Sequence, residues 1–430
     1  MSMRIVWGSP WNERSAIAAF GVAVVEELLA RGHQVEVLRT ELGAAAKLSS
    51  RPSSARVRFW GDIALSEFSR NADVVIGNFG NHYPFHGALL ENFSAVGIVG
   101  IFHDCVLSHL AEGWANASPN PALMLRRLVL ATYGASAWPG DEPFIPDFAT
   151  AARQRPMLEW FASGVTGAVA HAQHYAERLR AVCPGPVAVI ALPFAADDLP
   201  PAPQPRQDEM VVATIGMGIS NKRMGQVMEA VAGSPRLRAH CRFRAIGEAD
   251  PDEQADLAKL SERLGVEAPA FTGWVSDEGL RAQLRDVDVL SCLRHPVLEG
   301  ASASLLLSML SARPVLVSHQ AVYAELPQGL VLPCAPGDEA ADVRRHLEWV
   351  MDHRLQARAM GERARAYVQR TNTAARYVDA LLPLLDAAVA ARPGVLAAQA
   401  LGKTLASFSL APADPSVERV AKTLAGLLGR

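Results

Sequence analysis

Apolar runs that end in glycine alternate with apolar residues at helical spacing along most of the chain. MRIVWG (3–8) is a continuous apolar run, and the segment 16–33 then places Ile17, Phe20 and Val24 on one helical face. Short apolar runs favour strands buried on both faces, whereas a spacing of three to four residues favours a helix. This alternation predicts an α/β fold in which helices cover both faces of a parallel sheet.

The same pattern occurs twice, on either side of a proline-rich segment at 199–209 that is typical of a linker. We therefore expect two Rossmann-like, doubly wound domains, 1–198 and 210–372, that face a central cleft. The expected strands are 3–8, 34–40, 72–80, 96–104, 166–172 and 186–194 before the linker, and 211–218, 242–250, 270–276, 287–293 and 314–319 after it.

The end of the chain is predicted to be helical. From about Asp338 to residue 392 the sequence is rich in alanine, and 393–430 is rich in alanine and leucine with one break between Ala411 and Pro415. This composition favours packed helices over disorder.

Length and composition limit the classes of function. A chain of 430 residues is too long for one core, and its net charge of -3 without a basic tract argues against nucleic-acid binding. The five cysteines are scattered and lack CxxC spacing, which favours a reducing, cytoplasmic compartment over disulfides or a zinc site.

Neither a signal peptide nor a membrane span is expected. The N-terminus resembles a first strand, and no uncharged apolar run approaches about 18 residues. Peripheral contact with the inner face of a membrane stays open through the helix that carries Arg344, Arg345 and His346, although a solvated helix face is the favoured interpretation.

The segment CLRHPVLEGASASLLLSMLSARPVLVS (292–318) carries the most informative chemistry. It predicts a strand, a turn of small residues around Glu299, a helix and a second strand. The N–H groups of a helix N-terminus favour phosphate, and a carboxylate beside them can accept hydrogen bonds from sugar hydroxyls. Plain capping by Ser302 and Ser304 is the simpler alternative, but charged Arg294 and Glu299 on either side of the turn favour a nucleotide-sugar site.

A second candidate loop, GMGISNKR (216–223), places Lys222 where a helix begins after a strand. Lysine is a compact positive charge that suits a diphosphate. The loop matches neither G-x-G-x-x-G nor the P-loop, and an ordinary connection with a solvated Lys-Arg pair is equally compatible with it.

Polar residues also follow two apolar strands of the first half. His103 and Asp104 end the strand at 96–104, where a histidine can bind a hydroxyl or transfer a proton; a structural histidine is the alternative. The loop GNFGNHYPFHG (77–87), with Asn78, Asn81 and His86, is either part of an acceptor pocket or an Asn/Gly-rich turn.

Asp286 and Asp288 form a D-x-D pattern, which binds divalent metal in some sugar transferases. Here it lies at a helix-to-strand junction, so a structural role is favoured and no metal is expected. The chain also lacks G-x-S-x-G and H-E-x-x-H.

Taken in order, these motifs resemble the family 4 glycosyltransferases of the GT-B fold, closest to a bacterial polysaccharide-assembly subgroup. The resemblance covers roughly residues 3–385. It consists of SAIAAF, IGNFGNHYPFHG, IFHD, GMGISNKR, FTGWVSDEGL, and LRHP followed by EGASASLLLSML, RPVLVS and AELP.

The resemblance implies a retaining transferase that uses a nucleotide-diphosphate-sugar, without metal or cofactor, and a glycan or lipid-linked acceptor. The C-terminal domain would bind the donor and the N-terminal domain the acceptor, with helices of 373–430 returning to the N-terminal domain. Front-side attack assisted by the leaving diphosphate would need no protein nucleophile, so catalysis would depend on positioning and charge stabilisation.

The resemblance also implies roles for individual residues. Lys222, with Arg223 or Arg294, would neutralise the diphosphate; N–H groups of Ser304 and Leu305 would bind phosphate; Val275 would face the base; and His103 would face the donor sugar. Catalytic roles are expected for His103, Asp104 and Glu299, and acceptor contacts for Asn78, Asn81 and His86. The expected donor-binding residues are Ser15, Ala16, Gly216, Lys222, Arg223, Gly247, Val275, Arg294, Gly300, Ala301, Ser302, Ser304 and Leu305.

Several positions depart from the family pattern. Leu307 stands where a second glutamate commonly holds the ribose, and Met217 stands where an arginine is usual. Glu299-Gly300 reverses the common Gly-Glu order, and Ala16 replaces a glycine.

Met217 and Leu307 keep open a first alternative, a GT-B protein that binds nucleotide or glycan with weak or no turnover. A second alternative is a nucleotide-sugar epimerase, which would need further acid/base carboxylates in the cleft. Product formation without an acceptor would distinguish the epimerase. The sequence carries no signal for the oligomeric state.

Overall fold

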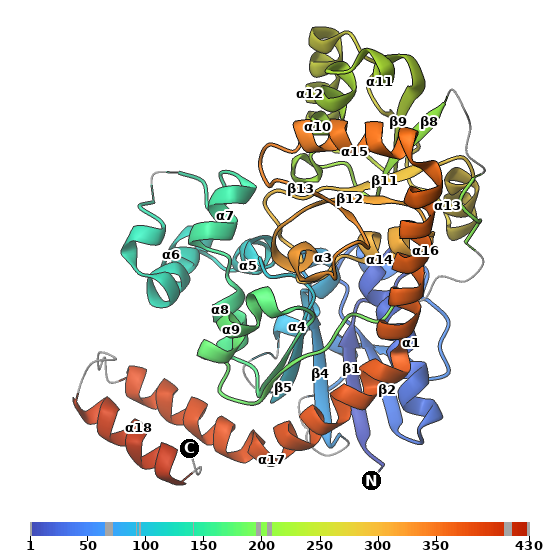
Figure 1. Cartoon of the computed structure of the whole chain (residues 1–430). Coiled ribbons are helices and arrows are strands. Elements are labelled where there is room, and N and C mark those ends of the chain that lie inside the picture. The colour runs from blue at the N-terminus through green and yellow to red at the C-terminus, as the bar shows by residue number, and fades with distance from the viewer. Residues whose placement is uncertain are drawn as a thin grey trace. The chain divides into compact units, whose positions relative to one another are not determined.

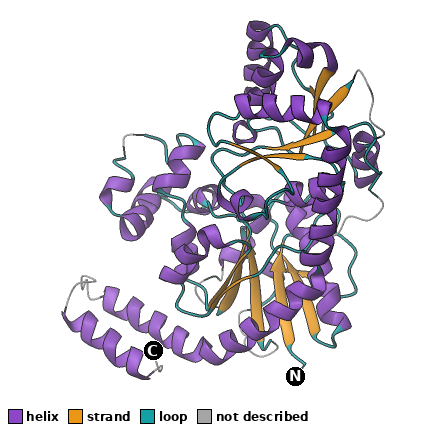
Figure 2. Cartoon of the chain, viewed as in Figure 1, coloured by secondary structure: helices purple, strands orange, loops and turns teal. Residues whose placement is uncertain are grey.

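The computed structural model describes residues 2–64, 72–91, 93, 96–140, 142–194, 199–203, 209–407 and 415–427. It divides into two compact units (Figure 1). Unit 1 comprises Met1–Pro146, Gln154–Ile190 and Tyr377–Arg430, and unit 2 comprises Asp147–Arg153 and Ala191–Arg376. Each unit is built around one parallel sheet with helices beside its strands (Figure 2).

The sheet of unit 1 has seven parallel strands in the order β3-β2-β1-β4-β5-β6-β7. The order reverses between β1 and β4, which is where doubly wound sheets bind ligands at the carboxyl ends of their strands. Its strands are β1 (Arg4–Ser9), β2 (Gln34–Arg39), β3 (Arg56–Phe59), β4 (Val74–Phe79), β5 (Ile98–Phe102), β6 (Gly167–Ala170) and β7 (Val187–Val189).

Four helices lie between β5 and β6 in the described part of the chain, where the general alternation of strands and helices marked no individual helix. They make this the longest connection between consecutive strands of the unit 1 sheet. Up to β7 the helices are α1 (Ala16–Ala30), α3 (Tyr83–His86), α4 (Ala88–Glu91), α5 (Ser108–Ala115), α6 (Pro121–Tyr133), α7 (Phe148–Gln154), α8 (Leu158–Ser163) and α9 (Gln173–Val182), with 3₁₀ turns at Ala45–Lys47, Trp60–Asp62 and Ala135–Ala137.

The sheet of unit 2 has six parallel strands in the order β10-β9-β8-β11-β12-β13, so its reversal lies between β8 and β11. Val212, Val289, Leu316 and Leu332, one from each of four strands, join a single hydrophobic cluster. The strands are β8 (Met210–Ile215), β9 (Cys241–Ile246), β10 (Ala270–Phe271), β11 (Val289–Cys292), β12 (Val315–Ser318) and β13 (Leu332–Cys334).

The helices of unit 2 follow its strands in the expected alternation. Several begin with a polar cap; Ser276, for example, accepts a hydrogen bond from the Gly279 N–H. They are α10 (Met224–Ala232), α11 (Pro235–His240), α12 (Pro251–Leu264), α13 (Asp277–Leu284), α14 (Ala303–Leu310), α15 (Ala340–Asp352) and α16 (Arg354–Thr371), with 3₁₀ turns at Ser220–Lys222 and Ala321–Glu325.

The predicted α/β fold with two parallel sheets is confirmed. Every expected strand is present, usually one to three residues shorter at its ends, because the polar turn residues were counted with the strands. The sequence missed β3 and β13. β3 (RVRF) alternates charged with apolar residues, and β13 is only three residues long, so neither forms the continuous apolar run that marked the others.

The last two helices are α17 (Ala374–Ser407) and α18 (Pro415–Leu427). α17 crosses below the strands of unit 1 in Figure 1. Its Arg392 donates a hydrogen bond to the carbonyl of Asp73 just before β4. The predicted helices at the end of the chain are confirmed, whereas most of the expected break, 411–414, lies outside the described residues.

The stretch Ala374–Leu405 of α17 is long and apolar enough to cross a membrane by length and composition, with 28% of its most apolar window buried. This finding differs from the sequence expectation, because Asp386 and Arg392 interrupt the uncharged run but leave its mean hydropathy high. Tyr377, Leu381 and Leu385 of the same helix are buried, as in a core helix.

A fully buried arginine holds the start of the proline-rich segment 199–209 in place within unit 2. Arg313 follows α14 and has no exposed surface. Burial lowers the pKa of its guanidinium to about 10. The guanidinium donates to the carbonyl oxygens of Leu284, Val287, Ser311, Pro200 and Pro201.

We predict that Arg313→Met destabilises the protein by about 3 kcal/mol or more, because several buried carbonyls lose their donor. The apparent Tm should fall by roughly 6–12 °C in thermal unfolding. Arg263→Met, which changes an exposed arginine of α12, is the matched control and should leave Tm unchanged. Equal Tm values for the two variants would contradict this role.

Candidate functional site

Arg294 organises the turn between β11 and α14. Its guanidinium donates to the Leu293 carbonyl at 2.7 Å and to Ser304 Oγ at 3.1 Å, and its Nε lies 3.1 Å from Glu299 Oε1. Only 5% of Arg294 is exposed. The predicted pair of charges around the turn therefore forms a direct ion pair.

Glu299 has a second partner that the sequence did not reveal. The Tyr323 hydroxyl, from the 3₁₀ turn after β12, donates to Glu299 Oε1 at 2.6 Å. Tyr323 is itself 1% exposed, and burial together with the Glu299 carboxylate raises its pKa. Arg294 and Tyr323 at Oε1, with the Leu298 N–H that donates to Oε2 at 3.3 Å, thus hold the carboxylate in one orientation beside the N-terminus of α14. The AELP motif that directly follows Tyr323 is the sequence feature that could have pointed to this contact.

The N-terminus of α14 is capped as its sequence indicated. Ser302 Oγ accepts a hydrogen bond from the Leu305 N–H at 3.2 Å and lies 3.1 Å from Ser304 Oγ. The Leu305 N–H therefore already has an internal acceptor, which matches the capping interpretation for this group. Gly300 is buried and Ala301 half-buried in the same turn.

Lys222 lies in the same part of unit 2. Its Nζ donates to the Ile215 carbonyl at 2.6 Å, at the carboxyl end of β8, and only 7% of the residue is exposed. Burial, followed by repulsion from Arg294, lowers the pKa of Lys222 well below its ordinary value. A buried lysine close to a second cation is an environment that binding of an anion would relieve.

Two glycines bring backbone into contact around Lys222. Gly216 has φ +89° and a Cβ there would meet Lys222 Nζ at 2.9 Å, while a Cβ on Gly247, with φ +149°, would meet the Gly216 carbonyl oxygen at 2.5 Å. Both positions therefore require glycine. They place the loops after β8 and β9 against each other.

The other expected donor residues of unit 2 occupy less buried places. Arg223 pairs with the buried Glu339 at 3.1 Å and donates to the Gly337 carbonyl. Val275 is half-buried in the loop after β10. Met217, at the position where an arginine is usual, is 46% exposed.

In unit 1, Ser15 caps α1 by accepting a hydrogen bond from the Ala18 N–H at 3.2 Å, and Ala16 is exposed at the first helical position. These two residues lie in the loop that follows β1, one of the two strands at the reversal of the unit 1 sheet.

His103 forms an internal chain of contacts at the carboxyl ends of β4, β5 and β6. Its Nε2 lies 2.9 Å from Asn78 Oδ1, its Nδ1 lies 3.2 Å from His171 Nε2, and His171 Nδ1 lies 3.0 Å from the Ile190 carbonyl. Burial lowers the pKa of His103 and lowers that of His171 to about 4. Both ring nitrogens of His103 thus already have protein partners, as a structural histidine would.

His171 was not among the predicted site residues, although it lies in the predicted strand 166–172 and directly follows β6, which ends at Ala170. The sequence feature that could have identified His171 is its position at the end of a predicted strand.

The loop after β4 divides into a buried and an accessible part. Asn78 and His86 are 0% and 2% exposed, and burial lowers the pKa of His86 to about 3. His86 Nδ1 lies 2.8 Å from the Asn78 carbonyl. These two residues therefore support the loop from within, which matches the turn interpretation.

Asn81 and Asp104, by contrast, are half-buried and linked to α5. The Asn81 N–H donates to Asp104 Oδ2 at 2.7 Å, and Asn81 Oδ1 accepts from the His109 N–H at 2.9 Å. His109 was not among the predicted residues. Its place in the first turn of a helix outside the expected elements explains why.

Within the described residues, no group of three or more His, Cys, Asp or Glu side chains could hold a metal ion. The D-x-D carboxylates have other partners. Asp286 pairs with Arg244 at 2.9 Å, and Asp288 accepts from the Val211 N–H at 2.8 Å.

Searches with protein-family models and against curated proteins found no match. Solved structures do match. Anabaena HepE in complex with UDP and glucose is 14% identical with a TM-score of 0.60, over 89% of this chain and 99% of that one. Sucrose-phosphate synthase from Thermosynechococcus elongatus is 14% identical with a TM-score of 0.62, over 90% and 100%.

The lipopolysaccharide outer core galactosyltransferase WaaB, in its apo form, is 13% identical with a TM-score of 0.54, over 91% of this chain and 100% of that one. At these identities the likeness defines the fold. The protein has the GT-B fold, which confirms the architecture predicted from the sequence.

We predict that Gly216→Ala lowers stability by about 1–2 kcal/mol, because alanine at φ +89° is strained and its Cβ would contact Lys222 Nζ. Thermal unfolding measures the effect. Gly61→Ala is the control, since a Cβ there meets nothing within 4 Å and its φ is ordinary. An unchanged Tm for Gly216→Ala would show that this loop is not held as described.

Proposed function

We propose that the protein is a glycosyltransferase that moves a sugar from a nucleotide-diphosphate-sugar to a glycan, lipid-linked or other acceptor, with retention of configuration and without metal, in cytoplasmic assembly of polysaccharide or glycoconjugate. The observation that carries this proposal is the convergence in unit 2 of Lys222, Arg294, Glu299 and the N-terminus of α14. They meet at the carboxyl ends of β8 and β11, the two strands at the reversal of the sheet.

The charges of this group suit a diphosphate. Arg294 is a buried cation that disfavours protonation of the buried Lys222, and one carboxylate, Glu299, pairs directly with Arg294. A diphosphate beside Lys222 would stabilise the charged form of the lysine, which burial disfavours. A hydroxyl-rich sugar beside Glu299 would offer donors to its carboxylate oxygens.

The comparisons support the same class of ligand, since the HepE structures hold UDP, UDP with glucose, or UDP-glucose. Retention fits a site without a protein nucleophile, in which positioned charges stabilise the leaving diphosphate. The expected catalytic roles of His103 and Asp104 stay predictions.

A protein of the same fold that binds nucleotide or glycan without turnover is the second candidate. It is favoured by Leu307, which is 8% exposed within α14 and offers no acid to a ribose, and by the exposed Met217. Sugar transfer distinguishes the two candidates.

The first experiment is a thermal-shift screen with UDP, GDP, ADP, dTDP and CMP, with and without EDTA. We expect at least one nucleoside diphosphate to stabilise the protein equally in both conditions. The absence of any shift would refute the donor site, and a shift that EDTA abolishes would refute metal independence.

We predict that nucleoside diphosphate binding takes up a proton. The pKa of Lys222 is low in the free protein and should rise beside a diphosphate, so between these two values affinity falls as pH increases. Calorimetric titration with UDP in HEPES and in Tris should give different heats. Lys222→Met should weaken binding by about tenfold or more and remove the buffer dependence, since one buried charge-assisted contact is lost.

Lys259→Met is the matched control, because Lys259 is an exposed lysine paired with Asp256 on α12. It should bind UDP like the wild type. If Lys222→Met also does so, Lys222 does not contact the diphosphate.

Glu299→Gln should lower transfer from UDP-glucose, or from the donor selected by the screen, by about 100-fold while UDP affinity changes little, because Glu299 contacts the sugar. Steady-state rates and UDP titration measure the two effects. Glu262→Gln on α12 is the exposed control. Equal losses of UDP binding and turnover would place Glu299 at the nucleotide instead.

A further inference from the structure

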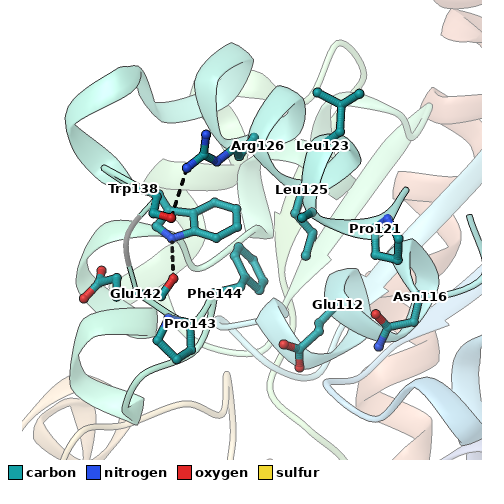
Figure 3. A pocket seen from close by; sticks show the side chains of 12 residues that line it. Glu112, Asn116, Pro121, Leu123, Leu125, Arg126, Trp138, Glu142, Pro143 and Phe144 are labelled. Carbon is teal, nitrogen blue, oxygen red and sulfur yellow. Dashed lines mark hydrogen bonds between the residues drawn. The ribbon is translucent and has the colours of Figure 1, made fainter. Parts of the chain in front are cut away.

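The connection between β5 and β6 contains a cavity that is separate from the proposed nucleotide-sugar site around Lys222 and Glu299. It has a volume of about 570 Å³, opens to solvent, and lies entirely within unit 1 between α5, α6 and residues 138–140 and 142–144 (Figure 3). This volume lies within the usual range for small-molecule sites, about 300–1,000 Å³.

One wall of the cavity is aromatic and held in place. The Trp138 indole N–H donates to the Glu142 carbonyl at 3.0 Å, and the ring packs edge-to-face against Phe144 with centroids 5.4 Å apart. The buried Arg155 guanidinium lies 5.7 Å from the Trp138 ring and pairs with Glu142 at 2.7 Å. This wall is therefore organised before any ligand arrives.

The opposite wall is polar. Glu112 and Asn116 lie one turn apart on α5 and so share a face of the helix, and both line the cavity (Figure 3). Their side chains form no hydrogen bond or ion pair with another described residue. They can therefore accept and donate hydrogen bonds to a ligand between the two walls.

The polar face of α5 continues toward the predicted acceptor residues. His109, three residues before Glu112, contacts Asn81, and Asn81 contacts Asp104. From His109 to Asn116 this face extends about 10 Å along the helix. It places a row of polar residues between the carboxyl end of β5 and the cavity.

We propose that this cavity binds the non-reacting sugars of a neutral glycan acceptor, at least a disaccharide in length. A sugar ring presents C–H groups on its face and hydroxyls at its edge, which matches an aromatic wall opposite a carboxylate and an amide. Glu112 and Arg126 both line the cavity and carry opposite charges, with the Arg126 guanidinium 5.9 Å from the Trp138 ring. The charge of Glu142 is balanced by Arg155, so these charges together suit a neutral sugar. This assignment rests on the proposed transferase function, because a bound glycan is an acceptor only if the protein transfers a sugar to it.

The test uses the full-length protein on a printed array of neutral and acidic oligosaccharides, followed by calorimetric titration of the neutral glycan with the strongest signal. We expect neutral oligosaccharides to bind and their monosaccharides to bind more weakly. Trp138→Ala and Glu112→Ala should each weaken binding at least about tenfold, and Trp138→Phe should retain most of it.

Glu177→Ala, an exposed glutamate of α9 in the same unit, is the matched control and should bind like the wild type. Because Trp138 packs against Arg155, its alanine variant can lose folding as well as a contact. Glu112→Ala, which removes a half-exposed side chain from a helix surface, keeps the test decisive.

Three results would overturn the assignment. They are binding of acidic glycans alone, no glycan binding at all, and glycan binding that is unchanged in Glu112→Ala and equal in Trp138→Phe and Trp138→Ala.

UDP binding on the same preparation separates the two proposals. Stabilisation by UDP without glycan binding would refute the cavity and leave the donor site intact. Glycan binding through Glu112 without binding of any nucleotide would keep the cavity as a glycan site and refute the transferase.

Discussion

The buried cation at Arg294 is the constraint on which the candidate donor site depends. A guanidinium with 5% exposure requires partners for its N–H groups, and it finds them in the Leu293 carbonyl, Glu299 and Ser304. These contacts tie the end of β11, the turn and the first turn of α14 into one unit. Tyr323 adds a second donor to Glu299 from a different part of the chain. The orientation of the carboxylate is thus a consequence of satisfying a buried charge.

The same constraint reaches Lys222. Its burial and the nearby Arg294 both disfavour its charged form, while contact between the loops at Gly216 and Gly247 keeps it at the end of β8. Such strained electrostatics are typical of functional sites, although structural ion pairs also produce them. Here the position at the reversal of the sheet, where doubly wound folds bind ligands, favours the functional interpretation.

Unit 1 uses its polar residues in two different ways. The chain of contacts from Asn78 through His103 to His171 is buried and internally paired, so it supports the loops at the carboxyl ends of three strands. Along α5, by contrast, His109 is paired with Asn81, whereas Glu112 lines the cavity. The histidine-rich loop 77–87 therefore belongs to the buried structure that supports the strand ends. The helix α5, which no sequence motif marked, carries the side chains that line the cavity.

The sequence by itself determined an α/β fold with two parallel sheets, because strands buried on both faces must be continuously apolar and helices that cover them must be apolar on one side. The GT-B architecture was indicated by the resemblance of its motifs to a known family. The sequence also identified the Glu299 turn and Lys222, since charges between buried strands are conspicuous in a linear pattern. Only the tertiary structure decided which polar residues are already paired, which is why His86, His103 and the Leu305 N–H turned out to have internal partners. Tyr323 reaches Glu299 across 24 positions, and Trp138 faces Glu112 across 26. Contacts between such distant positions depend on how elements pack, and no local pattern of hydrophobic and polar residues encodes them.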